Sequence, residues 1–434
     1  MPIFNPAVET MSREELSALQ LARLQDIVRY TFERVAFYRE RMLSAGVSPD
    51  DIKTLDDVRR LPFMEKPDFR AQYPFGMLAV PRDEIVRIHA SSGTTGKATV
   101  AAYTAGDIEM WAECAARALG CAGMTKADTV QVAYGYGLFT GGLGMHDGAT
   151  RMGAAVVPAS TGGTEKQIGL LVDFGVTGIC CTPSYALQIA EVAEQMGVDL
   201  RQQPLRSAIC GAEPWTEAMR SNIESRLGVQ AFDIYGLTEA CGPGVGCSCE
   251  AHNGIHMCED FFLVELIDPD TGEPVPDGER GELIITALTK KGMPLVRYRT
   301  HDLTRVVPGP CSCGRTHKRI ARFTGRTDDM LIIRGINVFP SQVEDVLVRI
   351  DGVLPQYLLV VERTGNLDTL EIKVEVEERF FSDTVRALEN LRTRIAHQIK
   401  SIVNVNAKIT LVEPGALART LGKAKRVDDR RKLM

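Results

Sequence analysis

The sequence lacks the features that place a protein in a membrane or in the secretory route. It has no run of roughly 18 apolar residues, so we expect no transmembrane helix. Its first residues, MPIFNPAVETMSREEL, show no basic segment followed by an apolar one. We therefore expect no secretory signal and assign the protein to the cytoplasm. Internal repeats and low-complexity segments are also missing.

An excess of positive charge is missing too. The chain has 50 Lys and Arg residues against 56 Asp and Glu residues, a net charge of −6. This balance argues against a nucleic-acid partner and against attraction to an anionic membrane surface. We expect small-molecule partners instead, and oligomeric state is open, with a homodimer as one alternative.

What the sequence does contain is a long globular chain with many cysteines. Its 434 residues are too many for one compact core and suit two or more domains. Its 11 cysteines should stay reduced in a protein without a secretory signal. Five of them lie in apolar runs and are predicted to be small buried hydrophobes: Cys114, Cys121, Cys180, Cys181 and Cys210.

The hydrophobic pattern predicts an α/β fold for the larger part of the chain. Residues 13–45 read as mostly helix because apolar residues recur at helical spacing. From about 85 to 245, short apolar runs such as TVQVAYGYG, VTGICCTPS and QAFDIYG alternate with amphipathic stretches. Such strand–helix alternation indicates a parallel sheet flanked by helices.

The pattern changes after residue 256. A β-rich subdomain is expected to about residue 325, because FFLVELIDPDTGEPVPDGERGELIITAL reads as two strands around a turn. The remaining residues alternate short strands and two helices, which is typical of an α+β domain. We therefore expect a large N-terminal domain over 1–325 and a small C-terminal domain over 326–434.

The segment SSGTTGK at 91–97 has the composition of a phosphate-binding loop. Its glycines let the backbone present N–H groups, and four hydroxyls and an ammonium add donors. A Walker P-loop would need Gly at 91 and Ser or Thr at 98, where this chain has Ser91 and Ala98. By itself the segment is also compatible with an ordinary surface turn.

This segment is the first of five motifs, and their order indicates its function. SSGTTGK is followed by YGLTE (235–239), YRTHD (298–302), GRTDD (325–329) and a lysine near the C-terminus. This order resembles the adenylate-forming superfamily of acyl-CoA synthetases, adenylation domains and luciferases. Further segments resemble the phenylacetate–CoA ligase family almost end to end: YGYGLFTGGLGMHDGA, CGAEPW, MLIIRGINVFPSQVE and GKAKRV.

The resemblance implies a nucleotide site. Glu239 would bind the Mg²⁺ of MgATP, a hard ion that suits carboxylate oxygens. Thr238 would contact the α-phosphate, Tyr235 and Gly236 would lie near adenine, and Asp302 would accept hydrogen bonds from both ribose hydroxyls. Arg326 would also contact the nucleotide. The residues implied for the β- and γ-phosphates are Ser92, Gly93, Thr94, Thr95, Gly96 and Lys97.

The resemblance also implies a catalytic lysine on a mobile C-terminal domain. Lys423 would bridge the carboxylate and the α-phosphate in the transition state, as a point charge on a flexible stem can. Lys425 is the nearby competitor. Asp328 would be the hinge, with Asp329 as the alternative, and rotation there would exchange Lys423 for a thioester-forming face.

An apolar acyl pocket is implied as well. Aromatic residues beside glycines can form a slot for a ring, although both aromatic residues could equally be ordinary core. No Lys or Arg lies within these segments to pair with a second carboxylate, which favours a monocarboxylic acid. The residues at the corresponding positions are Tyr136, Phe139, Gly141, Gly211, Ala212, Glu213 and Pro214.

A cysteine and histidine cluster predicts a zinc site. Two ligands from each of two loops would suit a tetrahedral ion, although Cys-x-Cys is tighter than the usual spacing. The preferred set is Cys249, His256, Cys311 and Cys313, with Cys247 and His252 as reserves. Four protein ligands would leave no open position and make the metal structural. Reduced cysteines without a metal are the alternative.

These expectations combine into an AMP-forming acid–CoA ligase. Phenylacetate or a related aryl acid would react with MgATP to an acyl-adenylate, which coenzyme A would convert to a thioester. One rival is an adenylating enzyme of the same superfamily with another acyl acceptor. A second is a non-catalytic, zinc-containing binding protein, which intact Lys423, Glu239 and Asp302 disfavour.

Overall fold

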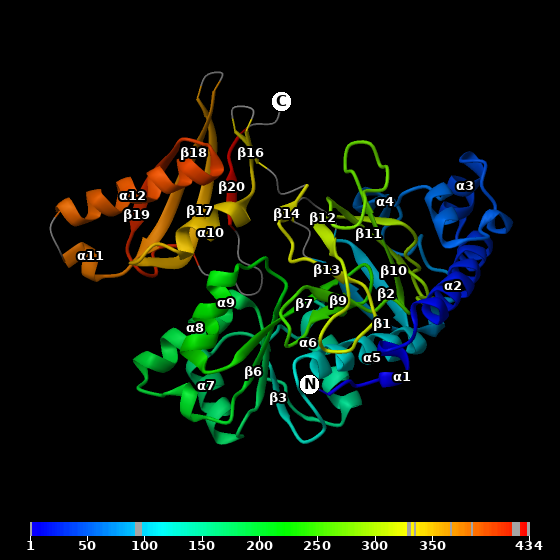
Figure 1. The fold of residues 1–434 in the computed structure, drawn as a ribbon, viewed down its shortest axis with the longest axis horizontal. Coiled ribbons are helices and arrows are strands. Elements are labelled where there is room, and N and C mark those ends of the chain that lie inside the picture. Colours follow the sequence, from blue (N-terminus) through cyan, green and yellow to red (C-terminus); the bar gives the residue numbers. More distant parts are fainter. Residues whose placement is uncertain are drawn as a thin grey trace.

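The computed structural model describes residues 2–91, 98–327, 331–333, 336–364, 367–382, 385–418 and 426–431. Helices at the N-terminus form one flank of the molecule (Figure 1). The second of them begins with a capping box, in which Ser12 and Glu15 exchange side-chain and backbone hydrogen bonds. These elements are α1 (Pro6–Glu9), α2 (Arg13–Arg34), α3 (Ala36–Ser44), α4 (Lys66–Ala71) and the 3₁₀ turns η1 (Pro49–Asp51), η2 (Leu55–Arg60) and η3 (Arg82–Glu84).

A twelve-stranded sheet organises the centre, in the order β10-β11-β12-β13-β9-β8-β7-β6-β5-β3-β4 with β14 paired to β12. Its parallel strands are β3 (Thr129–Val132), β4 (Ala155–Val157), β5 (Gly178–Cys181), β6 (Ser207–Gly211) and β7 (Gln230–Leu237). The antiparallel strands are β8 (Gly242–Ser248), β9 (Ile255–Met257), β10 (Phe262–Ile267), β11 (Arg280–Ala287), β12 (Tyr298–Val307), β13 (Arg319–Ile320) and β14 (Gly325–Arg326).

Helices connect the parallel strands, as the alternation predicts. They are α5 (Ala105–Cys121), α6 (Gly141–Met152), α7 (Thr164–Asp173), α8 (Pro183–Gln195) and α9 (Glu217–Leu227), with the 3₁₀ turn η4 (Leu200–Gln202). A separate two-stranded sheet of β1 (Ile85–Ala90) and β2 (Val100–Thr104) precedes them. The strands of the predicted β-rich subdomain do not form a sheet of their own. Hydrogen bonds join them to the parallel strands in the same large sheet.

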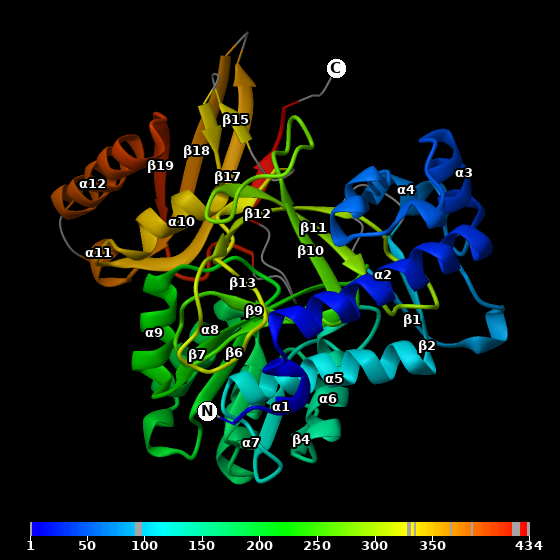
Figure 2. The same ribbon diagram turned by 45° about the vertical axis from the view of Figure 1, so that its right-hand side comes forward.

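The C-terminal elements gather in a lobe of their own, at the upper left of Figure 1 and again apart from the helical flank in Figure 2. A four-stranded sheet in the order β19-β18-β17-β20 carries two long helices. The lobe has its own hydrophobic core, built on residues such as Val343, Leu359, Ile372 and Ile395. Its elements are β15 (Leu331–Ile333), β16 (Ile336–Val338), α10 (Pro340–Val348), β17 (Val353–Thr364), β18 (Leu367–Val376), α11 (Arg379–Ser382), α12 (Val385–Val403), β19 (Ala407–Val412) and β20 (Val427–Asp429).

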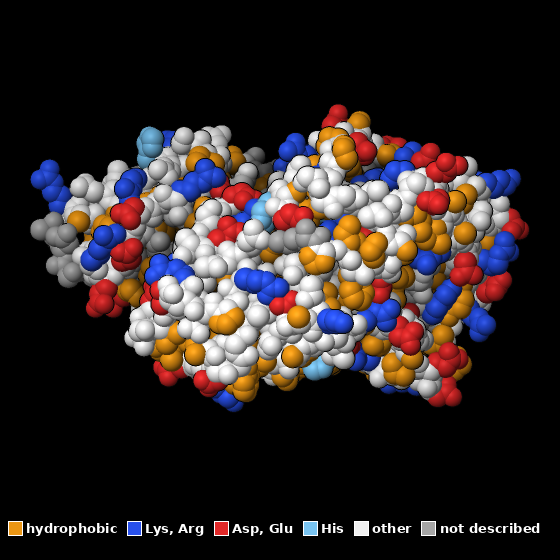
Figure 3. Space-filling view, turned by 60° about the horizontal axis from the view of Figure 1, so that its bottom comes forward, with side chains coloured by type: hydrophobic (Ala, Val, Ile, Leu, Met, Phe, Trp, Pro, Cys, Tyr) orange, Lys and Arg blue, Asp and Glu red, His pale blue; other side chains and the backbone are white. Residues whose placement is uncertain are grey.

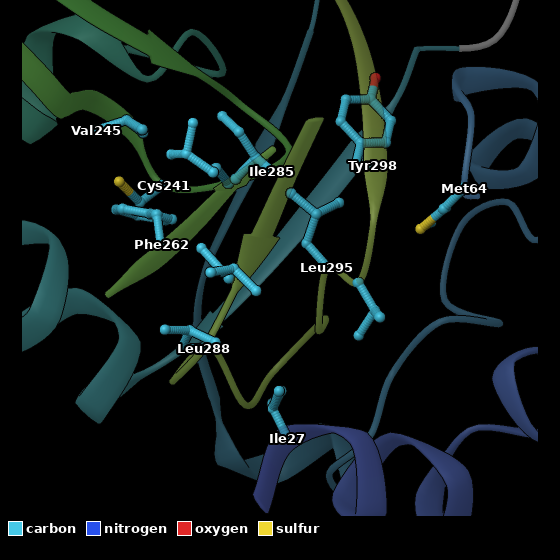
Figure 4. Close-up of a cluster of buried hydrophobic side chains, with 14 of the residues drawn as sticks. Ile27, Met64, Cys241, Val245, Phe262, Ile285, Leu288, Leu295 and Tyr298 are labelled. Atoms are coloured by element: carbon cyan, nitrogen blue, oxygen red, sulfur yellow. The ribbon is translucent and has the colours of Figure 1, made fainter. Parts of the chain in front are cut away.

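The largest core cluster lies between α2 and the strands β10 to β12, as Figure 4 shows for Ile27, Phe262 and Ile285. Burying one such side chain stabilises the fold by about 1.5–3 kcal/mol. The five cysteines predicted to be core residues are all buried. Within the described residues, no helix combines the length and apolar character needed to cross a bilayer. On the face in Figure 3, acidic and basic side chains are interspersed.

Candidate active site

Tyr235, Asp302 and Arg326 come together from three strands. Asp302 on β12 lies opposite Arg326 on β14 in the sheet register. Its carboxylate accepts hydrogen bonds from Arg326 Nη1 and from the Tyr235 hydroxyl, both at 2.7 Å. These two donors hold the Asp302 carboxylate in place. Because each carboxylate oxygen can accept more than one hydrogen bond, the carboxylate can still bind further donors. The Tyr235 ring lies 4.5 Å from that of Phe323.

The predicted glycines beside this group have a structural reason to be glycine. A Cβ on Gly236 would lie 1.7 Å from the carbonyl oxygen of Gly242 on the neighbouring strand, and one on Gly211 would lie 2.4 Å from the oxygen of Ile234. Ala212 follows β6 with a φ of 69°, which a non-glycine residue seldom adopts. Strain of this kind is concentrated at functional sites.

Thr238 and Glu239 end the YGLTE segment in a buried position, with 7% and 6% of their surface exposed. The Thr238 carbonyl accepts a hydrogen bond of 2.6 Å from the Tyr103 hydroxyl, and the Glu239 carbonyl accepts one of 2.6 Å from Lys290 Nζ. The Glu239 carboxylate lies beside the Tyr298 phenol, whose pKa burial raises and this carboxylate raises further. Three buried contacts thus fix the segment.

The predicted acyl-pocket residues fall on two loops. Tyr136 and Phe139 lie between β3 and α6, and the Tyr136 hydroxyl is 3.3 Å from His146 Nδ1. Phe139 is 43% exposed, so it is not an ordinary core residue. Gly141 begins α6, where a Cβ would collide with the Phe139 ring at 2.5 Å. Gly211 ends β6, and Ala212, Glu213 and Pro214 follow it on the second loop.

The second loop meets the C-terminal lobe. Glu213 accepts a hydrogen bond of 2.7 Å from Ser184 Oγ, and across from it the buried Glu344 of α10 pairs with Arg426 at 3.3 Å. Burial raises the pKa of Glu344 to about 7, against the opposing effect of Arg426, and the Glu213 charge adds to the rise. The Arg426 guanidinium also lies 4.5 Å from the ring centre of Tyr357. The carboxylates of Glu213 and Glu344 are therefore close enough to repel one another where the loop and the lobe meet.

Several predicted residues lie outside the described parts of the chain: Ser92, Gly93, Thr94, Thr95, Gly96, Lys97, Asp328 and Lys423. A hydrogen bond links the residues on either side of the phosphate segment: Ser91 N donates to the carbonyl oxygen of Thr99 at 2.9 Å. Arg426 lies three residues after Lys423 and is anchored through its carbonyl, which accepts a 2.9 Å hydrogen bond from Leu359 N.

The preferred metal ligands meet in space although 64 positions of sequence separate the first from the last. One ligand atom from each of Cys249, His256, Cys311 and Cys313 lies within 4.8 Å of the others. Cys249 Sγ and Cys311 Sγ are 3.6 Å apart, and Cys313 Sγ is 3.4 Å from His256 Nε2. The reserve residue Cys247 instead points its thiol at the Ala118 oxygen.

A polar cavity of about 310 Å³ lies elsewhere and contains none of the predicted nucleotide or acyl residues. Two of the three arginines that line it are paired with carboxylates: Arg220 donates to Glu217 at 2.6 Å, and Arg322 donates to Asp233 at 2.7 Å.

Comparisons with known proteins match both parts of the chain. The family model of AMP-binding enzymes matches residues 18–288, and that of the AMP-binding enzyme C-terminal domain matches residues 335–431. Phenylacetate-coenzyme A ligase of Thermus thermophilus is 51% identical over 99% of this chain and 100% of its own length. The Escherichia coli enzyme of the same name is 49% identical over 98% of each chain.

A solved structure extends the match to the fold. 2-Hydroxyisobutyryl-CoA ligase in the postadenylation state superposes with a TM-score of 0.92 at 31% identity, over 98% of this chain and 91% of that one. Fold and site therefore define an adenylate-forming, AMP-binding enzyme. The chain belongs to the phenylacetate–CoA ligase family of AMP-forming acid–CoA ligases.

The same ligase in the thioesterification state, with 2-HIB-AMP and CoA, gives a TM-score of only 0.73, over 98% of this chain and 92% of that one. The sequence identity is nearly the same, 32%. The lower TM-score therefore reflects a different arrangement of the structure and not a more divergent sequence. The described arrangement of this chain is therefore closer to the postadenylation structure.

Sequence reasoning missed Tyr103, Lys290, Glu344 and Arg426. Arg426 lies in the basic segment GKAKRV, which gives no signal of burial. Lys290 lies beside apolar residues in LTKKGMPL, and a cation in such a position is a signal of burial with a partner. Nothing in the sequence identifies that partner. His301, the residue before Asp302, places its Nδ1 2.9 Å from Thr327 Oγ1.

Proposed function

We propose that the enzyme activates phenylacetate, or a closely related arylacetic acid, and transfers the acyl group to coenzyme A. The observation that carries the proposal is the carboxylate of Asp302 on β12, held on both oxygens by Tyr235 and Arg326, where it can receive a ribose diol. The substrate named for the relatives, which match over nearly the whole chain, supports phenylacetate. The exposed Phe139 and half-buried Tyr136 give the site aromatic surface for a ring.

In the first half-reaction, the carboxylate oxygen of the acid attacks the α-phosphorus of ATP and pyrophosphate leaves. Two anions meet, so the site must supply positive charge and oriented donors. In this proposal 92–97 hold the β- and γ-phosphates, Thr238 contacts the α-phosphate, Lys423 bridges the reacting groups, and Glu239 holds the metal. Mg²⁺ would offset phosphate charge. In the second half-reaction, the CoA thiol attacks the acyl carbon and AMP leaves, which requires no covalent enzyme intermediate.

The two half-reactions would use two arrangements of a domain over 1–325 and a domain over 326–434, with Asp328 as the hinge. The TM-scores of 0.92 and 0.73 to two states of one related ligase support this reading. The separate hydrophobic core of the C-terminal elements supports it as well.

Pyrophosphate release from ATP tests the function directly. The panel contains phenylacetate, indoleacetate, benzoate, hydroxybenzoates and short fatty acids, each with and without CoA. We expect release with phenylacetate, and AMP plus thioester only when CoA is present. Release with fatty acids alone, or AMP without thioester, would overturn the proposed substrate or the proposed acceptor.

Glu344 should make stability depend on pH. A carboxyl group whose pKa is about 7 in the folded protein and about 4.3 when unfolded binds more protons in the fold between these values. Stability is then lost as pH rises from about 5 to about 8, by at most about 3 kcal/mol from this group. Glu344→Gln should lose that part of the dependence and gain stability relative to wild type at pH 8.

Denaturant unfolding at pH 5 and pH 8 measures this. Glu389→Gln, in the same lobe but in an exposed pair with Arg392, is the matched control and should keep the wild-type dependence. Equal pH dependence in wild type and Glu344→Gln would contradict the assignment.

We also propose that the four-residue cluster holds a structural zinc ion. In a tetrahedral site with ligand distances of about 2.0–2.3 Å, ligand atoms lie about 3.3–3.8 Å apart, and the measured 3.4 and 3.6 Å fit. Neighbouring Cys249 and His256 lower the pKa of the Cys313 thiol, while the same contact with Cys313 raises the pKa of Cys249, so one thiol of the pair is poised to lose its proton first. His256 Nδ1 has no hydrogen-bond partner among the described residues, so the usual support of a ligating imidazole is missing.

Metal analysis of the purified protein tests the zinc proposal. We expect about one zinc ion per chain, and loss of the ion with a lower melting temperature in Cys311→Ser. Cys247→Ser alters a nearby buried thiol outside the cluster and should keep the metal. A metal-free wild type of full activity and stability would make these residues reduced cysteines only.

A further inference from the structure

Lys290 is a fully buried cation that the mechanism above does not use. It lies between β11 and β12, and only 1% of its surface is exposed. Removing an ammonium group from water is costly unless the protein supplies a partner. Among the described residues, its only hydrogen-bond partner is the carbonyl oxygen of Glu239, at 2.6 Å.

A tyrosine completes the surroundings of this lysine. Lys290 Nζ lies 4.6 Å from the ring centre of Tyr103, a distance that allows a cation–π contact. The hydroxyl of the same tyrosine donates to the Thr238 carbonyl. Two side chains that touch one another therefore hold two consecutive carbonyl groups of the YGLTE segment. Burial lowers the pKa of Lys290 to about 8, opposed by the charges of Asp107, Cys241 and Glu239, so the amine is mostly protonated at pH 7.

The backbone that carries Lys290 is itself fixed. Asp107 caps helix α5, and its carboxylate also accepts hydrogen bonds from Lys291 N at 2.7 Å and Gly292 N at 2.8 Å. Leu288, just before the lysine, belongs to the core shown in Figure 4. The position of the amine is therefore set by the fold and not by a flexible loop.

Simple space filling does not account for the residue. An apolar side chain of similar length would fill this volume without the cost of burying a charge. Direct contact with ATP is also excluded in this arrangement, because the side chain is closed off from solvent. What remains is the bond to the carbonyl of Glu239, the residue whose carboxylate is proposed to hold Mg²⁺.

We propose that Lys290 is a positioning residue for adenylation: it fixes the main chain at Glu239 so that the carboxylate stays in place to bind the metal of MgATP. The inference rests on the proposed function. Without the ammonium, the Glu239 carbonyl loses its partner and the peptide can rotate, which moves the carboxylate attached to the same residue. The effect should concern the metal-dependent half-reaction and spare the second.

Lys290→Met is the test variant, because methionine keeps most of the volume and removes the amine. Pyrophosphate release is measured against Mg²⁺ concentration, and thioester formation is measured separately from supplied phenylacetyl-AMP and CoA without Mg²⁺. We expect the Mg²⁺ concentration for half-maximal release to rise about tenfold or more, from an interaction of about 1.4 kcal/mol or more. The second half-reaction should stay within about threefold of wild type.

Lys291→Met is the matched control, since Lys291 is the adjacent residue and pairs with Asp26 near the surface. It should behave as wild type in both assays. If Lys290→Met is not recovered folded, Lys290→Gln, which keeps an N–H donor without the charge, should show a smaller shift in the same direction. An unchanged Mg²⁺ requirement, or equal loss of both half-reactions, would overturn the inference alone. No pyrophosphate release from wild type would overturn the proposed function and the inference with it.

Discussion

Replacing Lys423 with alanine should abolish most of the adenylation activity and leave much of the thioester half-reaction. The lysine is proposed to offset the negative charge that develops between the carboxylate and the α-phosphate. Removing one such preorganised charge costs on the order of 10²–10³ in rate. Pyrophosphate release from ATP and phenylacetate should fall by this factor. Thioester formation from supplied phenylacetyl-AMP and CoA should keep at least about a third of the wild-type rate, because that step proceeds in the other arrangement.

Lys425→Ala is the control, because it removes the same charge two residues away in the same motif. It should retain adenylation. A larger loss in Lys425→Ala than in Lys423→Ala would exchange the two assignments. Equal loss of both half-reactions in Lys423→Ala would contradict the two-arrangement mechanism.

The second large effect is expected at Asp302. Asp302→Ala removes the proposed acceptor of the ribose hydroxyls and leaves the guanidinium of Arg326 and the hydroxyl of Tyr235 without this partner. Hydrogen bonds to a charged group contribute about 1.5–3 kcal/mol each, so kcat/KM for ATP should fall about 100-fold. The KM for phenylacetate should change little, because the acid binds at another part of the site.

Asp128→Ala provides a matched control for Asp302→Ala. Asp128 also forms a short pair with an arginine, Arg206 at 2.6 Å, and its side chain is only 5% exposed. Its loss should lower the melting temperature without changing KM for ATP. If both variants lose stability equally and both keep wild-type kcat/KM, Asp302 is a structural residue and does not bind the ribose.

Local patterns are sufficient for most elements of this protein. The strands β3 to β7 follow from short apolar runs, and the helices between them follow from apolar residues at helical spacing. The middle of the sheet is less well predicted: β8, β9 and β13 are short or rich in glycine, so they give little signal. Their continuity with the parallel strands depends on hydrogen bonds between distant segments.

The sequence by itself determines the class of enzyme, because the motifs for phosphate, ribose and the catalytic lysine keep their order whatever the packing. It also limits the candidate zinc ligands to a few cysteines and histidines, since ligand chemistry belongs to side-chain type, and the structure then brings Cys249, His256, Cys311 and Cys313 together. Only the tertiary structure decides that Lys290 holds the Glu239 carbonyl 51 positions away, that Glu344 faces Glu213, and that Asp302 lies between Tyr235 and Arg326. Such contacts depend on how twisted strands and packed helices bring distant residues together, and burial then sets their partners and their pKa values.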